Sequence, residues 1–148
     1  MGKTWQEKLH DAHDLPKVAV VEKSMMGIKA GQRMVIAPPM EYNEEMSKVP
    51  KGKIITVPTI RDHISKKHGA DVTCPLTAGI FTNIVAQASE EVGGDVAWWR
   101  TVKANGELNE KYPGGQAHQA EMLESEGHEI DRSRKRWFVK DYQKNEIV

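Results

Sequence analysis

The sequence predicts one small α/β domain, mostly helical, built around a helix-turn-helix. Residues 59–68 and 75–91 carry this prediction, because both have apolar side chains at helical spacing and only a short connection separates them. Several short runs of β-branched residues, bounded by proline or glycine, add a few brief strands. With 148 residues and 39% hydrophobic side chains, the chain can bury one modest core.

The first forty residues are predicted to hold one short helix and one or two strands. Residues 4–13 form the helix, with Trp5 and Leu9 one turn apart on a small apolar face. Residues 15–21 start either a strand or a second helix. Residues 34–37 are a short apolar run that two prolines end.

A helix over residues 40–49 and a strand over residues 53–57 follow. The turn Pro50-Lys51-Gly52 separates them. Ile54 and Ile55 make residues 53–57 the best short strand of the chain.

The first helix of the helix-turn-helix covers residues 59–68. Pro58 suits its first turn, because the N–H that proline lacks would have no partner there. Ile60 and Ile64 form its inner face, and Gly69 is expected to end it in a left-handed conformation.

The second helix covers residues 75–91 and is followed by a different backbone. Gly93-Gly94 is expected to end it, and the segment around Trp98 to be extended. Its inner face is predicted from apolar residues strictly four apart: Leu76, Ile80, Ile84 and Ala88.

The C-terminal third is predicted as one helix and one hairpin. The helix covers residues 115–126 and ends at Gly127. Ile130 and Trp137-Phe138-Val139 form the hairpin around a basic run at residues 132–136. That run is interpreted either as a basic wing or as a solvated loop.

Charge is balanced, with 21 basic and 21 acidic side chains. Dedicated nucleic-acid binders are usually basic, so any DNA binding must come from local patches. Between Lys67 and Arg100 there is no lysine or arginine, so the helix over residues 75–91 carries no positive charge.

Several classes of protein are excluded or disfavoured by composition. The chain lacks the apolar run of a membrane span or a signal peptide, so we expect a cytoplasmic protein with no membrane partner. A single cysteine, Cys74, excludes an internal disulfide. His63 and His68 are five apart and His118 and His128 ten apart, so neither pair has metal-ligand spacing, and no metal or cofactor is predicted.

The run Trp98-Trp99-Arg100-Thr101-Val102, followed by Asn105-Gly106 and Gly114-Gly115, resembles a known active site. It is similar to the Pro-Cys-His-Arg-Val-Val motif, Gly turn and Gly-Gly of the O6-alkylguanine-DNA alkyltransferases. The runs at residues 49–56 and 77–84 also look like that family's entry to a winged helix-turn-helix and its minor-groove helix. The resemblance covers residues 46–128.

This resemblance implies the domain organisation. Residues 1–40 would be an N-terminal extension packed on the core. Residues 41–148 would be a winged helix-turn-helix domain of the alkyltransferase type, closed by the C-terminal β-hairpin.

The reactive groups of that family are replaced. Trp98 stands for the cysteine, Trp99 for the histidine, and a gap-free count puts Ala120 at the glutamate. An indole nitrogen has no basic lone pair, so it cannot act as a nucleophile or base, and the sequence predicts no enzyme and no catalytic residue. The family's DNA-handling tyrosine and arginine are replaced as well, by Val57 and by Cys74-Pro75 or Leu76.

Tryptophan in place of the cysteine is the hallmark of the alkyltransferase-like proteins, which bind O6-alkylguanine lesions without repairing them. The resemblance therefore implies a non-catalytic lesion sensor whose partners are duplex DNA, alkylated or plain, and excision-repair proteins. The alternative is a repurposed scaffold that binds a protein or a small ligand, which the uncharged helix over residues 75–91 favours.

The predicted base-pocket and DNA-binding residues each have a structural alternative. Trp98 lines a pocket or fills the core, and Arg100 contacts phosphate or donates to loop carbonyls. Lys51 and Lys53 contact phosphate or lie in a solvated turn. The full set is Trp98, Trp99, Arg100, Lys51, Lys53, Thr77, Asn83, Tyr112 and Arg136.

Overall fold

The structure, a computed structural model, describes residues 3–148. Its helices are α1 (Trp5–His10), α2 (Pro39–Ser47), α3 (Val57–Lys67), α4 (Pro75–Glu91) and α5 (Gly115–Ser125), with 3₁₀ turns η1 (Trp98–Arg100), η2 (Ala104–Gly106) and η3 (Tyr142–Asn145). Its strands are β1 (Lys17–Val20), β2 (Arg33–Ile36), β3 (Ile55–Thr56), β4 (Val72–Thr73), β5 (Thr101–Val102), β6 (Ile130–Asp131) and β7 (Phe138–Val139). Among the helices of residues 3–148, none combines the length and apolar character that a membrane crossing requires.

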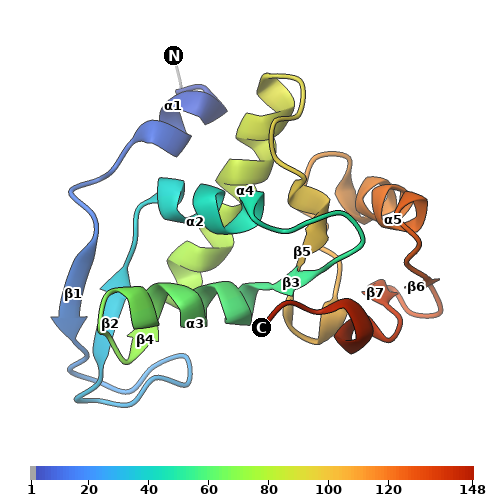
Figure 1. Cartoon of the computed structure of the whole chain (residues 1–148). Helices are drawn as coiled ribbons and strands as arrows, with labels where there is room; N and C mark the ends of the chain where they lie inside the picture. The colour runs from blue at the N-terminus through green and yellow to red at the C-terminus, as the bar shows by residue number, and fades with distance from the viewer. Residues whose placement is uncertain (1–2) are drawn as a thin grey trace.

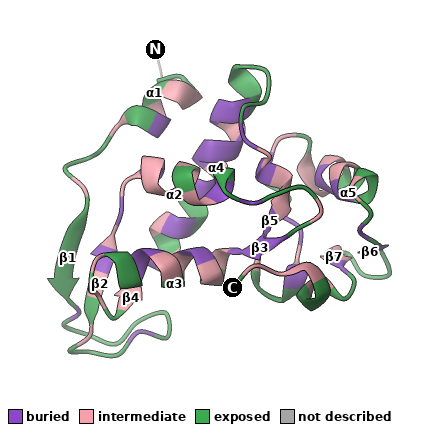
Figure 2. Ribbon diagram, in the orientation of Figure 1, coloured by how far each residue is buried: buried purple, intermediate pink, exposed green. Residues whose placement is uncertain are grey.

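Helix α4 lies at the centre of the molecule (Figure 1), and α1, α2 and α3 pack around it. The larger core cluster joins these helices to η1 through side chains such as Tyr42, Ile60, Val85 and Trp98. A second cluster, around Leu108 and Leu123, joins α5 to the short strands near the C-terminus. Figure 2 shows the buried residues concentrated along α4 and the segments that face it.

The strands form three small sheets. Strand β2 pairs antiparallel with β1 and parallel with β4, with Met34 opposite Val72. Strand β3 pairs parallel with β5, and β6 pairs antiparallel with β7, which confirms the predicted hairpin. The predicted strand over residues 53–57 is shorter than expected, because α3 already begins at Val57.

The N-terminal segment is held to α4 by hydrogen bonds to an exposed carboxylate. Thr4 and Glu7 form a reciprocal capping box that starts α1. Glu91, at the end of α4, accepts the backbone N–H groups of Trp5 at 2.9 Å and Gln6 at 2.8 Å. Helix α1 therefore lies on α4, although the division of the chain at residue 40 stays a prediction.

The two predicted helices of the helix-turn-helix form where the sequence placed them. Helix α3 has Pro58 in its first turn, and Gly69 follows it with a φ of +64°. Ile60 and Ile64 are buried, as predicted. Local signals at both ends fixed these boundaries, since proline and glycine act on the backbone itself.

The predicted inner face of α4 is wrong in its first half. Ile84 and Ala88 are buried, but Leu76 is 59% and Ile80 49% exposed. Residues four apart turn by about 40° more than one full turn, so a strict four-residue row drifts around the helix. Phe81 and Val85 take the inward positions instead, and the N-terminal half of α4 presents an apolar surface to solvent.

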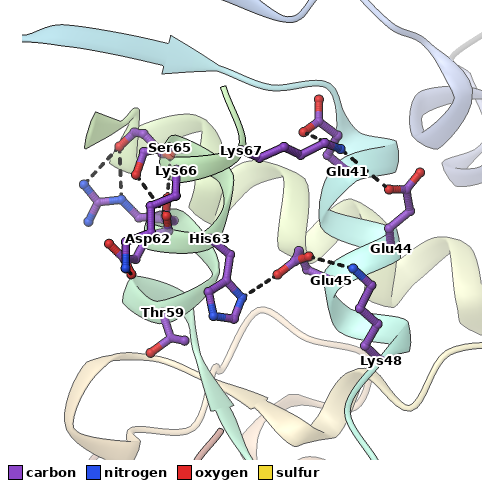
Figure 3. A network of polar contacts seen from close by, with 12 residues as sticks. Glu41, Glu44, Glu45, Lys48, Thr59, Asp62, His63, Ser65, Lys66 and Lys67 are labelled. Atoms are coloured by element: carbon purple, nitrogen blue, oxygen red, sulfur yellow. Dashed lines mark hydrogen bonds and ion pairs between the residues drawn. The ribbon is translucent and has the colours of Figure 1, made fainter. Parts of the chain in front are cut away.

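Helices α2 and α3 are joined by two histidine–glutamate contacts. The Nδ1 of His63 lies 2.6 Å from Oε1 of Glu45, and the Nε2 of His68 lies 2.7 Å from Oε1 of Glu41. Figure 3 shows Glu45 between His63 and Lys48, so one carboxylate of α2 contacts two basic side chains. These contacts bind the two helices at their partly exposed edge and leave Ile60 and Ile64 to fill the core.

Gly114 is required by both its backbone and its surroundings. Its φ is +78° as it leads into α5, and a Cβ there would lie 2.5 Å from the Cβ of His118. We expect Gly114→Ala to lower the free energy of unfolding by about 1–3 kcal/mol. Gly127→Ala is the matched control, because Gly127 has a φ of +97° but nothing within 4 Å of the added Cβ. In urea denaturation Gly114→Ala should cost more than the control, and equal losses would remove the steric part of this explanation.

Candidate nucleic-acid interface

The Trp98 segment is a tight turn, and the extended conformation predicted for it is wrong. Residues Trp98–Arg100 form η1, in which the N–H of Arg100 donates to the carbonyl of Ala97 at 3.2 Å. In an extended strand, consecutive side chains point to opposite faces. In this turn the Trp98 and Trp99 rings instead meet edge to face, with centroids 5.7 Å apart.

Trp98 is a core residue. Its side chain is 0% exposed and packs against Tyr112 at 5.3 Å and His118 at 5.8 Å between ring centroids. Its indole N–H donates to Glu90 at 2.9 Å. The prediction that Trp98 forms the wall of an open base pocket is therefore wrong in this structure, because a ring without exposed surface cannot stack on a base.

Tyr112 lies in the same packed environment as Trp98. It is buried, and burial raises the pKa of its phenol well above the ordinary value, so the hydroxyl stays neutral. The prediction that Tyr112 offers an accessible contact to a base or to DNA is wrong for the same reason as for Trp98.

Arg100 and Trp99 both bind the carboxylate of Glu126. Arg100 donates to Glu126 through Nε at 3.0 Å and Nη2 at 2.8 Å, and through Nη1 to the carbonyl of Val49 at 2.8 Å. The Trp99 indole N–H donates to the same carboxylate at 3.0 Å. Arg100 is thus a structural donor, as the alternative predicted, and is not free to contact phosphate.

Glu126 corrects the residue count made from the sequence. The gap-free count placed Ala120 at the acid, but Ala120 is fully buried in the second core cluster. Glu126, just after α5, is the acid that faces Trp99. The sequence does contain a clue to this acid, because Glu126-Gly127 closes the predicted helix over residues 115–126.

The charge of Glu126 is stabilised by its donors. Burial alone would raise its pKa, but hydrogen bonds from Arg100, Trp99 and the N–H of Gly52, with the charge of Arg100, outweigh burial and lower the pKa below its usual value. The aromatic turn, the loop before β3 and the end of α5 are therefore joined by one ionised carboxylate.

The predicted basic residues do not lie on one surface. Lys51 and Lys53 are exposed on the turn next to Glu126, at the end of α5. Arg136 lies on the hairpin near Gln116, at the start of α5, 3.7 Å from Glu107. A helix of 11 residues is about 16 Å long, so α5 separates the two groups.

The exposed half of α4 is the best surface for a ligand. Leu76, Gly79 and Ile80 are exposed there, with Thr77 and Asn83 half-buried beside them. Lys8 and Lys111, which α4 itself does not supply, lie next to this surface and line a hollow with Ile80 and Asn83. The charges along α4 do not predict these lysines, because they come from α1 and from the loop after η2.

Cys74 is buried directly before α4 and is separate from the Trp98 turn. It is the N-cap residue of that helix, and its backbone N–H donates to Val35 at 2.9 Å. Burial and the N-cap position give Cys74 a structural role at the start of α4.

Comparison with known proteins gives a likeness at the level of the fold. No family model matches the chain, and no curated protein matches its sequence. Two solved structures match with a TM-score of 0.54 and 19% identity, each over 74% of this chain and 94% of the other. They are S. pombe Atl1 in complex with damaged DNA containing O6-carboxymethylguanine, and S. pombe ATL in complex with DNA.

The chain has the Atl1 fold. This finding supports the fold predicted from the resemblance, a mixed α/β architecture of helices and small sheets. At 19% identity it carries over no function by itself.

Proposed function

We propose that this protein binds duplex DNA without altering it, through the N-terminal half of α4. The observation that carries the proposal is the exposed, uncharged face of Leu76, Gly79 and Ile80 on a helix of the Atl1 fold. Apolar wedges and small residues suit the narrow minor groove, where side chains enter between base steps. Long charged side chains would prevent such close approach.

Phosphate contacts would come from beside the helix. Lys8 on α1 and Lys111 on the loop after η2 line the hollow that adjoins this face. Lysines beside an inserted helix can neutralise phosphates, which makes affinity fall as salt rises. Balanced charge overall predicts weak binding with a small salt dependence.

A duplex that contains O6-alkylguanine is the proposed target, as in the alkyltransferase-like proteins. The shared fold with Atl1, solved in complex with DNA that contains O6-carboxymethylguanine, supports this proposal. The resemblance of the Trp98 run to the alkyltransferase motif, with tryptophan in place of cysteine, supports it as well. Because Trp98 is buried, the preference would come from easier deformation of damaged DNA and not from stacking on Trp98. Action in the cytoplasm and contact with excision-repair proteins are part of the same proposal.

Fluorescence anisotropy with matched plain and O6-methylguanine duplexes tests this function. We expect binding by the natural protein at low salt, tighter for the lesion duplex, and at least about tenfold weaker binding by Leu76→Glu, because its carboxylate would face phosphates. Val92→Glu is the control, since Val92 is 53% exposed at the other end of α4. Equal affinities of the two variants would contradict an interface at Leu76.

The same samples test whether the protein is an enzyme. After incubation with the methylated duplex, the intact mass should be unchanged, because no thiol lies in the Trp98 turn. A gain of one methyl group would contradict the non-catalytic assignment.

A protein-binding scaffold is the second candidate, and the absence of lysine and arginine along α4 favours it. In that case the apolar face of Leu76 and Ile80 would bind a partner protein. Anisotropy would then show no binding to either duplex at low salt.

A further inference from the structure

We propose that the hollow between α1 and α4 binds a small amphipathic anion, with an apolar ring or chain inside and one acidic group at the rim. The hollow has a volume of about 600 Å³. That size lies within the range of small-molecule sites in proteins. The inference does not depend on DNA binding, and the site lies outside the Trp98 turn.

The floor of the hollow is apolar. It is formed by Gly79, Ile80, Phe81 and Ile84 of α4, and Trp5 of α1 forms a wall. Phe81 is held from behind by Tyr42, with ring centroids 5.9 Å apart, so this side of the hollow is packed against the core. Burial of an apolar ring or chain against these side chains would supply most of the binding free energy.

The rim carries more positive than negative charge, with three lysines and one carboxylate among the residues that line the hollow. Lys3 pairs with Asp11 at 2.5 Å, which neutralises the acidic residue of the lining. Lys8 lies over the Trp5 ring, 4.2 Å from its centroid, and Lys111, on the loop between η2 and α5, lines the same hollow. Within residues 3–148 neither Lys8 nor Lys111 is in ion-pair contact with a carboxylate, so the charge of the rim favours an anion.

Polar groups between the floor and the rim can orient the ligand. The Asn83 amide lines the hollow and retains its donor, since only its oxygen receives a bond, from Gln87 at 3.4 Å. His13 stacks on Phe81 with an interplanar angle of 6° and completes the wall. An apolar body with one acidic group matches this arrangement, while a fully polar anion would leave the floor unfilled.

A pair of fluorescent probes tests the site on the full-length protein. Anilinonaphthalene sulfonate and N-phenylnaphthylamine have the same apolar rings, but only the first carries a negative charge. We expect the sulfonate to bind with one-to-one stoichiometry and at least about fivefold more tightly than the neutral probe. Lys8→Gln and Lys111→Gln should each weaken the sulfonate about threefold and leave the neutral probe unchanged, whereas Lys53→Gln, on a distant exposed turn, should change neither.

Gly79→Leu tests the position of the site without loss of the fold. An added Cβ at Gly79 meets nothing within 4 Å, and leucine favours a helix more than glycine does. The leucine side chain would fill part of the hollow and weaken both probes at least about tenfold, with the circular dichroism spectrum retained. Unchanged sulfonate affinity in Gly79→Leu, or equal losses in Lys53→Gln and Lys8→Gln, would overturn the proposal.

Discussion

Trp98→Ala is expected to lower the free energy of unfolding by about 3–5 kcal/mol, the usual cost of removing a large aromatic side chain from a core. The ring is 0% exposed and contacts Trp99, Tyr112 and His118, so its loss leaves a cavity where α4, η1 and the α5 segment meet. The same change also removes the donor to Glu90. Since small domains are stable by only about 5–15 kcal/mol, urea denaturation would show the loss clearly.

Two variants separate core packing from other causes. Trp98→Phe keeps an aromatic ring and should lose only about 1–2 kcal/mol, for the smaller volume and the missing N–H. Trp137→Ala removes a half-buried tryptophan that lies under Arg132 on the hairpin, and should cost less than Trp98→Ala. A loss below about 1 kcal/mol for Trp98→Ala would mean that this ring is not part of the core.

Glu126→Gln is expected to lower the free energy of unfolding by about 2–4 kcal/mol at neutral pH. The side chain is only 5% exposed and accepts from Arg100, Trp99 and Gly52. Glutamine keeps the shape but removes the charge, which leaves the guanidinium of Arg100 partly buried without its counter-ion. Chemical denaturation at pH 7 measures this loss directly.

The pH dependence of the same pair has a definite sign. The pKa of Glu126 is lower in the folded protein than the ordinary value of 4.5, so the folded state binds fewer protons than the unfolded state. Its contribution is complete above about pH 4.5 and is lost as the pH falls through the folded pKa. Glu126→Gln should therefore lose less stability than the natural protein between pH 5 and pH 3.

Glu124→Gln is the matched control for Glu126. Glu124 pairs with Arg132 at 2.7 Å, but both side chains are exposed, so solvent and salt screen the pair. We expect only a small change at neutral pH. If Glu124→Gln and Glu126→Gln lowered the free energy of unfolding equally, the buried position of Glu126 would not explain the loss in Glu126→Gln.

Features fixed by neighbouring residues could be predicted from the sequence. Helix α4 spans the residues expected for it, and α3 begins and ends at its proline and glycine signals. The fold class and the hairpin were also predicted correctly. These predictions rest on the backbone preferences of single residues and on periodicity, which act locally.

Features that depend on contacts between residues far apart in the sequence could not be predicted in this way. Whether Leu76 faces the core depends on which element covers that end of α4. The spacing of apolar residues along the helix does not contain this information. The Glu126 carboxylate meets Trp99 from 27 residues away, and a gap-free count cannot allow for the loop between them. Lys8 and Lys111 line the same hollow beside α4 only in the folded chain, so the charges along the helix sequence do not predict either of them.

We propose that DNA binds at the exposed end of α4, while the side chain of Trp98 packs in the core. An NMR titration of isotope-labelled protein with a short duplex locates the binding surface, since each backbone amide reports on its own surroundings. We expect the largest shifts at Leu76, Gly79 and Ile80, and smaller ones at Lys8 and Lys111. Shifts confined to the Lys51 turn and the Arg136 hairpin, or no shifts at low salt, would contradict the claim.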